Sequence, residues 1–329
     1  MTRRRRPPGS PLLIGTRSSA MALAQTEHVV RLLQRLDPGL RTETVATTTA
    51  GDTWPGDLTR LGGKGLFVKA IDEQLQRGEA DIAVHCLKDV PGDRPLPDGL
   101  TIAAMLPRAD VHDVLVVPEG SPVTSPAELP EGASVATSAV RRKAQLLAVR
   151  PDLRVLPVRG TVGTRLAKLD SPRPPGPDGD GDRTPADAMV LARAGLRRLG
   201  LTARVRYEFP LEEMLPAVGA GVLALLCREE DETAAALLHQ LDDPATHAEA
   251  DAERSMLHGL QGHCNSPIAG HCTTAPDGRL SLRGLVFSGD GTRFARAHLS
   301  AGSADDPAAL GRRVCAELSR QGARHIIGA

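Results

Sequence analysis

Past its midpoint the sequence reads Leu215-Pro216-Ala217-Val218-Gly219-Ala220-Gly221-Val222-Leu223-Ala224-Leu225-Leu226-Cys227, and the path of the whole chain depends on this stretch. The stretch is apolar, and its glycines suit a chain that bends as it passes from one body to another. The apolar residues after such a hinge are expected to return to a sheet that earlier residues have begun. This crossing implies a first domain that is discontinuous in sequence.

The sequence before this stretch contains two series of short apolar runs that alternate with helical periodicity, which is typical of βαβ units. The first series predicts strands at 12–14, 42–48 and 81–84, with helices at 20–36 and 67–77. The second predicts strands at 113–117, 134–136, 155–158 and 188–191, with helices at 141–148, 163–169 and 193–199. Two successive α/β domains are therefore expected.

The pattern changes from residue 233 on. Helices are predicted at 233–241 and 247–260, and the runs 280–287 and 293–299 predict a hairpin around a Ser-Gly-Asp-Gly turn. A last helix should begin at Asp306-Pro307, because an aspartate followed by proline is a typical helix start. This part is expected to form a small α+β domain.

The predicted fold class is therefore α/β, with two periplasmic-binding-protein-like α/β domains joined by crossovers and a small α+β C-terminal domain. Residues 1–110 and 218–240 would form domain 1, residues 111–217 domain 2, and residues 241–329 domain 3. A stretch of prolines, glycines and aspartates at 171–186 is predicted to be a disordered insertion in domain 2.

The composition limits the possible partners. The chain has 329 residues, of which 41% are hydrophobic, and forty Lys and Arg balance forty Asp and Glu. A net charge of zero gives no general attraction to nucleic acid or to an anionic membrane. Aromatic residues make up only 2%, too few for the stacking surfaces of single-strand or RNA binders. We expect neither a nucleic acid nor a membrane as partner. We also expect the protein to be a monomer.

The cysteines indicate a reducing compartment. There are five of them, an odd number, and no two are spaced as Cys-x-x-Cys. The basic N-terminus is followed by an apolar run, Leu12 to Ile14, that is too short for a signal-peptide core. We therefore expect a cytoplasmic protein with a flexible N-terminal tail.

Basic and hydroxyl residues gather where predicted strands end. Three segments, Gly15–Ser19, Thr137–Arg142 and Arg159–Arg165, each follow a strand and run into a helix. Backbone N–H groups and the helix dipole favour anions there, and guanidinium groups add bidentate pairing with carboxylates or phosphates. Any one of these arginines could instead be a solvated surface residue. Together they predict a basic cleft for a ligand with several negative groups.

Gly62-Gly63-Lys64-Gly65 resembles a phosphate loop but lacks the Ser or Thr after the lysine that would bind magnesium. A nucleotide-dependent kinase or ligase is therefore not expected. A glycine-hinged mobile loop that carries Arg60 and Lys64 over the cleft is the preferred interpretation.

His85-Cys86-Leu87-Lys88-Asp89 closes a predicted strand with a lysine beside an aspartate. Such a pair is commonly an ordinary surface ion pair of little energetic weight. In a cleft rich in arginine, however, Asp89 would stay ionised and could accept a proton or stabilise a developing cation. Asp89 is therefore a candidate catalytic carboxylate.

Cys264 lies in the polar loop Gly262–Pro267, between a predicted helix and a strand, where a thiol is a candidate nucleophile or attachment point. The dipeptides His263-Cys264 and His271-Cys272 raise a zinc alternative. No standard structural-zinc spacing is met, and adjacent side chains usually diverge, so no metal is expected.

These motifs together resemble the porphobilinogen deaminase (hydroxymethylbilane synthase) family over nearly the whole chain. The matching segments are long and occur in order: Gly62–Lys69, Ala80–Pro91, Arg159–Leu169, Ala194–Leu201, Leu215–Gly219 and the loop around Cys264. The resemblance implies a transferase that condenses four porphobilinogen units head to tail, with loss of ammonia, into the linear tetrapyrrole hydroxymethylbilane. It also implies one covalent dipyrromethane cofactor per chain, attached to Cys264 by a thioether, as the primer.

The resemblance further implies roles for individual residues. Asp89 would contact pyrrole N–H groups and stabilise the cation left when ammonia departs, with Lys88 and the arginines near the reacting centre, Arg17, Arg159 and Arg165. The cofactor would be held by Cys264, Lys88, Asp89, Thr137, Ser138, Arg141, Arg142, Ser19, Lys64, Arg60 and Gly163.

The sequence departs from the family pattern at some positions, namely His112, Ala139, Thr161, Ala220 and His263. These changes would weaken single contacts to carboxylates, so a divergent paralogue with altered activity is one alternative. A periplasmic-type receptor for anionic solutes is another, because two α/β domains and a basic cleft describe such receptors too. It predicts a signal peptide and needs no third domain with a thiol.

Overall fold

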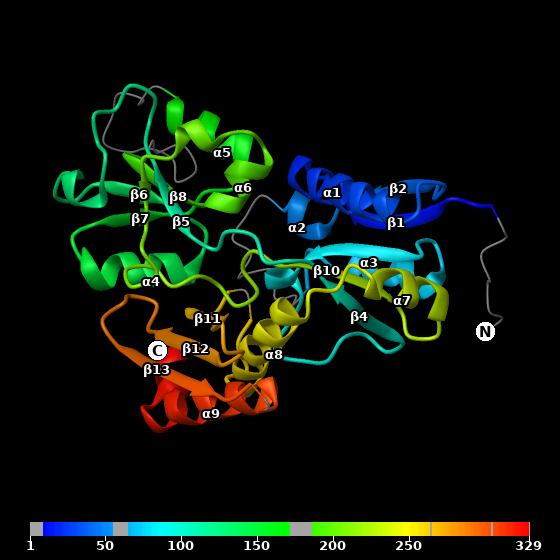
Figure 1. The fold of residues 1–329 in the computed structure, drawn as a ribbon. Helices are drawn as coiled ribbons and strands as arrows, with labels where there is room; N and C mark the ends of the chain where they lie inside the picture. The colour runs from blue at the N-terminus through cyan, green and yellow to red at the C-terminus, as the bar shows by residue number, and fades with distance from the viewer. Residues whose placement is uncertain (1–8, 55–64, 172–185, 264, 304, 329) are drawn as a thin grey trace. The chain divides into compact units, whose positions relative to one another are not determined.

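The computed structural model describes residues 9–54, 65–171, 186–263, 265–303 and 305–328 (Figure 1). The chain separates into two compact units, Met1–Arg108 with Gly221–Ala248, and Ala109–Ala220 with Glu249–Ala329. The predicted N-terminal tail and most of the predicted insertion at 171–186 lie outside the described residues.

In the first unit, the described residues form a five-stranded sheet of order β2-β1-β3-β10-β4. Strands β1, β2 and β3 are parallel, whereas β10 runs antiparallel to both of its neighbours. The elements of this unit are β1 (Leu12–Arg17), α1 (Ala20–Leu36), β2 (Thr42–Thr47), α2 (Ala50–Thr53), α3 (Lys69–Arg77), β3 (Ile82–Cys86), the 3-10 helix η2 (Leu87–Asp89), β4 (Leu100–Met105), β10 (Leu223–Arg228) and α7 (Glu232–His239).

The end of the apolar run at 215–227 forms most of strand β10. Leu225 and Cys227 of β10 are buried in one core cluster with Ile14 and Val84 of the neighbouring part of the sheet. Gly219 and Gly221 have φ of +73° and +80°, a conformation that favours glycine, and the chain passes between the two units at this point.

The second unit contains a sheet with the same plan, of order β7-β6-β8-β5-β9. Here β6, β7 and β8 are parallel, and β5, the strand that arrives from the first unit, is antiparallel to its neighbours. The elements are β5 (Asp113–Val116), η3 (Pro126–Glu128), β6 (Ser134–Ala136), α4 (Val140–Val149), β7 (Arg154–Leu156), α5 (Val162–Asp170), β8 (Ala188–Ala192), α6 (Arg193–Arg198), η4 (Thr202–Arg204) and β9 (Tyr207–Glu208).

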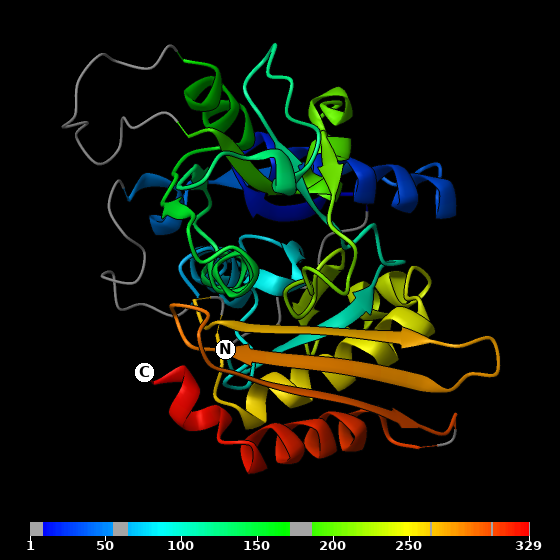
Figure 2. The ribbon, with the colours of Figure 1, turned by 90° about the vertical axis from the view of Figure 1, so that its left-hand side faces the viewer.

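Helix α8 (Pro244–Gly259) leads into the C-terminal part of the second unit. There the antiparallel strands β11 (Ile268–Thr274), β12 (Leu280–Phe287) and β13 (Phe294–Ala301) form a three-stranded sheet, followed by α9 (Pro307–Arg320) and α10 (Ala323–Ile327). Figure 2 shows α9 running along these strands. Alternate residues of β12, among them Leu280, Leu282 and Val286, are buried, which is the pattern of a sheet with one covered face.

The fold class predicted from the sequence is confirmed: two α/β sheets and a small C-terminal α+β part. Strands β4 and β9 were not predicted, whereas β11 is the strand expected after the Cys264 loop. The structure also starts α3 at Lys69 rather than at residue 67, because residues 65–68 form turns that precede the helix. The division into three domains stays a prediction, since the C-terminal part and the second sheet belong to one compact unit.

Candidate active site

Three parallel strands of the first sheet end at the same edge, and a charged residue follows or closes each of them. Arg17 is the last residue of β1, Asp52 lies in α2 just after β2, and Asp89 ends the 3-10 helix η2 after β3. Open α/β sheets place their ligands at this edge, because the chain segments diverge there. These three side chains form the centre of the candidate active site in the first unit.

The guanidinium of Arg17 has partners on three sides. Its Nε donates to Asp52 Oδ2 at 3.2 Å, and its Nη2 donates to the other oxygen of that carboxylate. Its Nη1 lies 3.8 Å from Asp89 Oδ2, and its Cζ lies 4.4 Å from the centre of the Phe67 ring. A bidentate carboxylate fixes the plane of a guanidinium, so Arg17 is held in one orientation toward Asp89.

Asp52 is itself fixed by the start of its helix. Its Oδ2 accepts hydrogen bonds from the Thr49 hydroxyl at 2.8 Å and from the Thr49 N–H at 3.2 Å. This is the reach-back contact of a capping box. Thr49 is buried, so this anchor is shielded from water.

Burial and pairing oppose each other in the Arg17–Asp52 pair. Burial raises the pKa of Asp52, but hydrogen bonds from Arg17 and Thr49 outweigh it, and the pKa lies below its usual value. Burial lowers the pKa of Arg17, but the hydrogen bond to Asp52 and the charges of Asp89 and Asp52 outweigh it, and the pKa is raised. Both groups are therefore ionised at neutral pH.

Asp89 borders a small pocket in the first unit. Its side chain is 23% exposed, so it remains open to a ligand. The pocket is lined by Arg17, Ala22, Gln25, Phe67, Val68, Val84, His85, Cys86 and Asp89. Lys88 beside it is exposed. Ser19 accepts a hydrogen bond from the Ala22 N–H at 3.3 Å and so caps α1, whose N-terminus lies at the same edge.

In the second sheet the parallel strands β6, β7 and β8 also end at one edge. Thr137 and Ser138 follow β6. Thr137 Oγ1 accepts from the Ala139 N–H at 3.3 Å. Ser138 Oγ donates to the Val158 carbonyl and accepts from the Val158 N–H at 3.2 Å, so it ties the loop after β6 to the loop after β7.

Arg141 and Arg142, at the start of α4, share one buried carboxylate. Arg141 Nη1 lies 2.7 Å from Asp113 Oδ2, and Arg142 Nη2 lies 2.7 Å from Asp113 Oδ1. Both arginines are 8% exposed. Each guanidinium therefore already has an internal counter-charge, and its role toward a ligand's carboxylates stays a prediction.

Arg165, on α5, lies in a positive field. Burial lowers its pKa, and the charges of Arg142 and Arg159 lower it further, to about 10. Its Nε donates to the Gly160 carbonyl at 2.9 Å, and the exposed Gly163 lies in the same first turn of α5. A ligand with several carboxylates would stabilise such a group of cations.

Some predicted site residues lie outside the described part of the chain: Arg60, Lys64 and Cys264. The glycine-hinged loop and the cofactor attachment therefore stay predictions.

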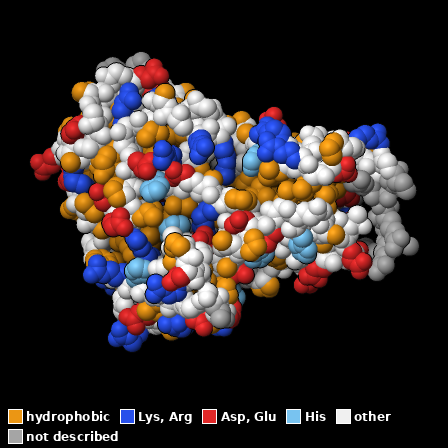
Figure 3. All heavy atoms as spheres, viewed as in Figure 1, with side chains coloured by type: hydrophobic (Ala, Val, Ile, Leu, Met, Phe, Trp, Pro, Cys, Tyr) orange, Lys and Arg blue, Asp and Glu red, His pale blue; other side chains and the backbone are white. Residues whose placement is uncertain are grey.

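Lys and Arg side chains are interspersed with Asp and Glu on the face shown in Figure 3, in keeping with the net charge of zero.

Three residues of the site were not predicted from the sequence: Asp52, Phe67 and Asp113. A signal for Asp52 was present, because Thr49-Ala50-Gly51-Asp52 has the spacing of a capping box. For Phe67 and Asp113 the sequence has no local signal, because their partners come from distant segments.

The dipyrromethane that the resemblance implies carries acetate and propionate side chains and pyrrole N–H groups. In the second unit the positive field around Arg165 suits such carboxylates, and in the first unit the partly exposed Asp89 can accept hydrogen bonds from N–H groups. In the described ranges, no three His, Cys, Asp or Glu side chains come together in a way that could hold a metal ion. None of the helices described there is long and apolar enough to span a bilayer.

Comparison with known proteins gives consistent matches along the chain. Residues 12–236 match the family model "Porphobilinogen deaminase, dipyromethane cofactor binding domain", and residues 247–320 match "Porphobilinogen deaminase, C-terminal domain". "Porphobilinogen deaminase 2" of Streptomyces coelicolor is 51% identical over 314 residues, which cover 95% of either chain. "Porphobilinogen deaminase" of Brevibacillus brevis is 41% identical over 315 residues, 95% of this chain and 96% of the relative. The Acidithiobacillus ferrooxidans protein of that name is 43% identical over 317 residues, 96% of this chain and 97% of the relative.

Proposed function

Because the chain belongs to the porphobilinogen deaminase family, we propose that it is a transferase of tetrapyrrole synthesis with hydroxymethylbilane synthase activity. It condenses four porphobilinogen molecules head to tail and releases ammonia at each addition. The observation that carries this proposal is the ionised Arg17–Asp52 pair beside Asp89 at the edge of the first sheet.

Asp89 is the proposed catalytic carboxylate. Loss of ammonia from porphobilinogen leaves a cation delocalised over the pyrrole ring, and a carboxylate within hydrogen-bond reach of the pyrrole N–H stabilises it. Arg17 Nη1 lies 3.8 Å from Asp89 Oδ2, so a guanidinium stands beside that carboxylate. Lys88, exposed beside it, is proposed to bind a carboxylate of the substrate or cofactor.

The cofactor site is proposed on the residues that the family resemblance assigns. When bound, dipyrromethane supplies the primer whose free α-position attacks each new unit. By that resemblance, Thr137, Ser138, Arg141 and Arg142 would hold its carboxylates, and Arg159 and Arg165 would act near the reacting centre. Cys264 would anchor it as a thioether. We further propose that the protein works in the cytoplasm as a monomer.

Intact-mass spectrometry of the purified protein tests the covalent part of the proposal. We expect a mass increase equal to two pyrrole units in the wild type and none in Cys264→Ser, because only a thiolate forms the thioether. Cys315→Ser, which removes a buried thiol on α9, is the matched control and should keep the adduct. An unmodified wild-type chain that releases no ammonia from porphobilinogen would contradict the proposed function and favour a solute-binding role.

Asp89→Asn tests the catalytic carboxylate. Asparagine keeps the size of the side chain but cannot balance a cation, so we expect kcat to fall by roughly a hundredfold or more. The thermal unfolding midpoint should stay close to that of the wild type, because the side chain is partly exposed. Near-normal ammonia release by this variant would remove Asp89 from the mechanism.

A further inference from the structure

Arg17 stands between two carboxylates that differ in how they hold it. Asp52 binds it through two guanidinium nitrogens, with the Nε contact at 3.2 Å, whereas Asp89 approaches only its Nη1, at 3.8 Å. The bidentate contact is the stronger one, since two charge-assisted hydrogen bonds act in parallel. The positive charge of Arg17 is therefore largely matched by Asp52, and the charge of Asp89 is left for another cation.

The support behind Asp52 is built from several segments. Thr49 holds one carboxylate oxygen with two hydrogen bonds. The Gly51 N–H donates to the Leu66 carbonyl at 3.3 Å, so α2 is tied to the segment that carries Phe67. A Cβ on Gly51 would lie 2.4 Å from the Phe67 ring, so a larger residue at this position would push the ring from its place beside the guanidinium. Arg17 is therefore held by a set of connected contacts that comes from Thr49, Gly51, Asp52 and Phe67.

We propose that Asp52 is a positioning residue of the reaction, which orients Arg17 and balances its charge so that Asp89 keeps its negative charge for the substrate cation. This proposal rests on the proposed function. It assigns no contact between Asp52 and substrate: Asp52 acts through Arg17. Without Asp52, Arg17 turns to Asp89 as its nearest acid and neutralises the carboxylate that the reaction needs.

The test is steady-state ammonia release by Asp52→Asn. We expect kcat to fall roughly tenfold to a hundredfold, with KM changed by less than about threefold, because Asp52 does not touch the substrate. Asp52→Glu should recover much of the rate, because glutamate is a common partner in a capping box. Each kcat is divided by the fraction of chains that carry the covalent adduct, read by intact mass, so that poor cofactor loading is not counted as slow chemistry.

Asp152→Asn is the matched control. Asp152 also makes a bidentate contact with an arginine, since Arg150 Nε and Nη2 each lie 2.7 Å from its oxygens. It belongs to the second unit, however, and does not line the pocket at Asp89. We expect its kcat to equal that of the wild type. A similar fall in both variants would mean that the loss of any such pair disturbs the protein, and the proposal would be wrong.

A double-mutant cycle with Arg17→Gln separates positioning from stability. If Asp52 acts through Arg17, the double variant should be no slower than Arg17→Gln alone. The proposal would be overturned if the reductions in kcat of the two single variants multiplied in the double variant. It would also be overturned if Asp52→Asn lowered only the unfolding midpoint and left kcat normal. An inactive wild type would instead overturn the proposed function, so the two failures can be told apart.

Discussion

Asp113 is a single carboxylate that serves two buried arginines. It is 1% exposed, and Arg141 and Arg142 each approach one of its oxygens at 2.7 Å. Replacing it by asparagine would leave two guanidinium groups in the interior without a counter-charge. We expect Asp113→Asn to lower the free energy of unfolding by about 3–5 kcal/mol, measured by urea denaturation.

Asp110→Asn is a control for this prediction, because Asp110 lies nearby but is paired with the partly exposed Arg193. It should cost at most about 1 kcal/mol. If both variants lowered the free energy of unfolding equally, the burial of Asp113 with its two arginines would contribute little to stability.

The same residue predicts how stability depends on pH. Burial raises the pKa of Asp113, but the charges of Arg141 and Arg142 lower it by more, so the folded-state pKa lies well below the unfolded value of 3.8. A carboxyl with a lowered pKa stabilises the fold above its unfolded pKa and loses that contribution as the pH falls toward the folded value. Thermal unfolding midpoints should therefore drop below about pH 4 in the wild type, and Asp113→Asn should show a shallower drop.

How far the sequence could predict the site becomes clear from single residues. Arg17 and Asp89 were identified because strand ends and an isolated acid among cations leave a local pattern. The pairing of Arg17 with Asp52 was not, because it joins residues thirty-five positions apart whose side chains meet only after the strands align. The burial of Arg141 and Arg142 was also hidden, since local sequence does not show that Asp113 lies beside them.

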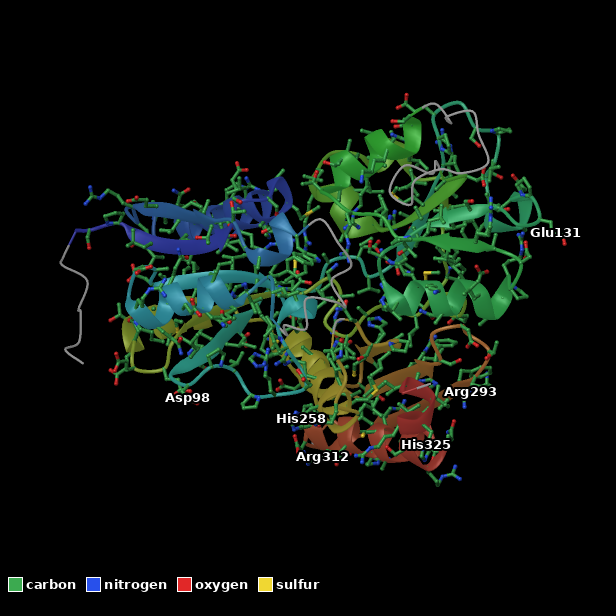
Figure 4. All side chains as sticks on the ribbon, turned by 180° about the vertical axis from the view of Figure 1, so that it is seen from behind. Asp98, Glu131, His258, Arg293, Arg312 and His325 are labelled. Carbon is green, nitrogen blue, oxygen red and sulfur yellow. The ribbon has the colours of Figure 1, made fainter. Side chains whose placement is uncertain are left out.

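Helices α8 and α9 pack so closely that one position between them must be glycine. A Cβ on Gly311 of α9 would lie 2.2 Å from the Ala252 carbonyl oxygen and 2.9 Å from the Met256 nitrogen, both in α8. The exposed His258 of α8 and Arg312 of α9 are both labelled in Figure 4. The two helices can accept a larger residue at 311 only by moving apart.

Gly311→Ala should therefore destabilise the C-terminal part by about 1–3 kcal/mol, measured as a shift in urea denaturation. Gly289→Ala is the control, because a Cβ at Gly289 meets no atom within 4 Å and its φ is not in the left-handed region. An unchanged midpoint for Gly311→Ala would mean that the helices separate at little cost.

At the level of elements, the sequence predicted best where a helix has its own start signal. Helix α1 spans Ala20–Leu36 as predicted, with Ser19 as its cap, and α9 begins after Asp306 with Pro307. Strand β4 was missed, because its burial does not alternate and its stability depends on pairing with β10, more than a hundred residues away. Strands of this kind are defined by their neighbours rather than by their own pattern.

At the level of the whole molecule, the first unit needs both of its chain segments. Strand β10 lies between β3 and β4, and Leu225 and Cys227 belong to the core. The Leu106 N–H donates to the Leu223 carbonyl at 3.0 Å, so the ends of the two segments are close. Residues 1–108 joined to 221–248 by a short Gly-Ser linker should therefore unfold cooperatively on heating, whereas residues 1–108 alone should not. A cooperative transition in the shorter fragment would contradict this.

The arrangement of the whole chain was easier to predict than its details. Alternating strands and helices define an α/β chain, and a glycine-hinged apolar run marks the point where the chain crosses back to its first sheet. The grouping of the C-terminal part with the second sheet was not visible in the sequence. That grouping depends on close contacts such as that between Gly291 and the backbone of Ala144 in α4, which only the folded chain creates.

In both five-stranded sheets the described strand that arrives from the other unit lies fourth in the order, and this has a consequence for synthesis on the ribosome. The second sheet has all its strands once Glu208 has emerged, whereas the first must wait for Leu223–Arg228. At ordinary elongation rates, β3 and β4 leave the ribosome on the order of ten seconds before their common partner. Of the two five-stranded sheets, the one that is begun first is thus completed second. During that interval the open edges of β3 and β4 are exposed to mispairing.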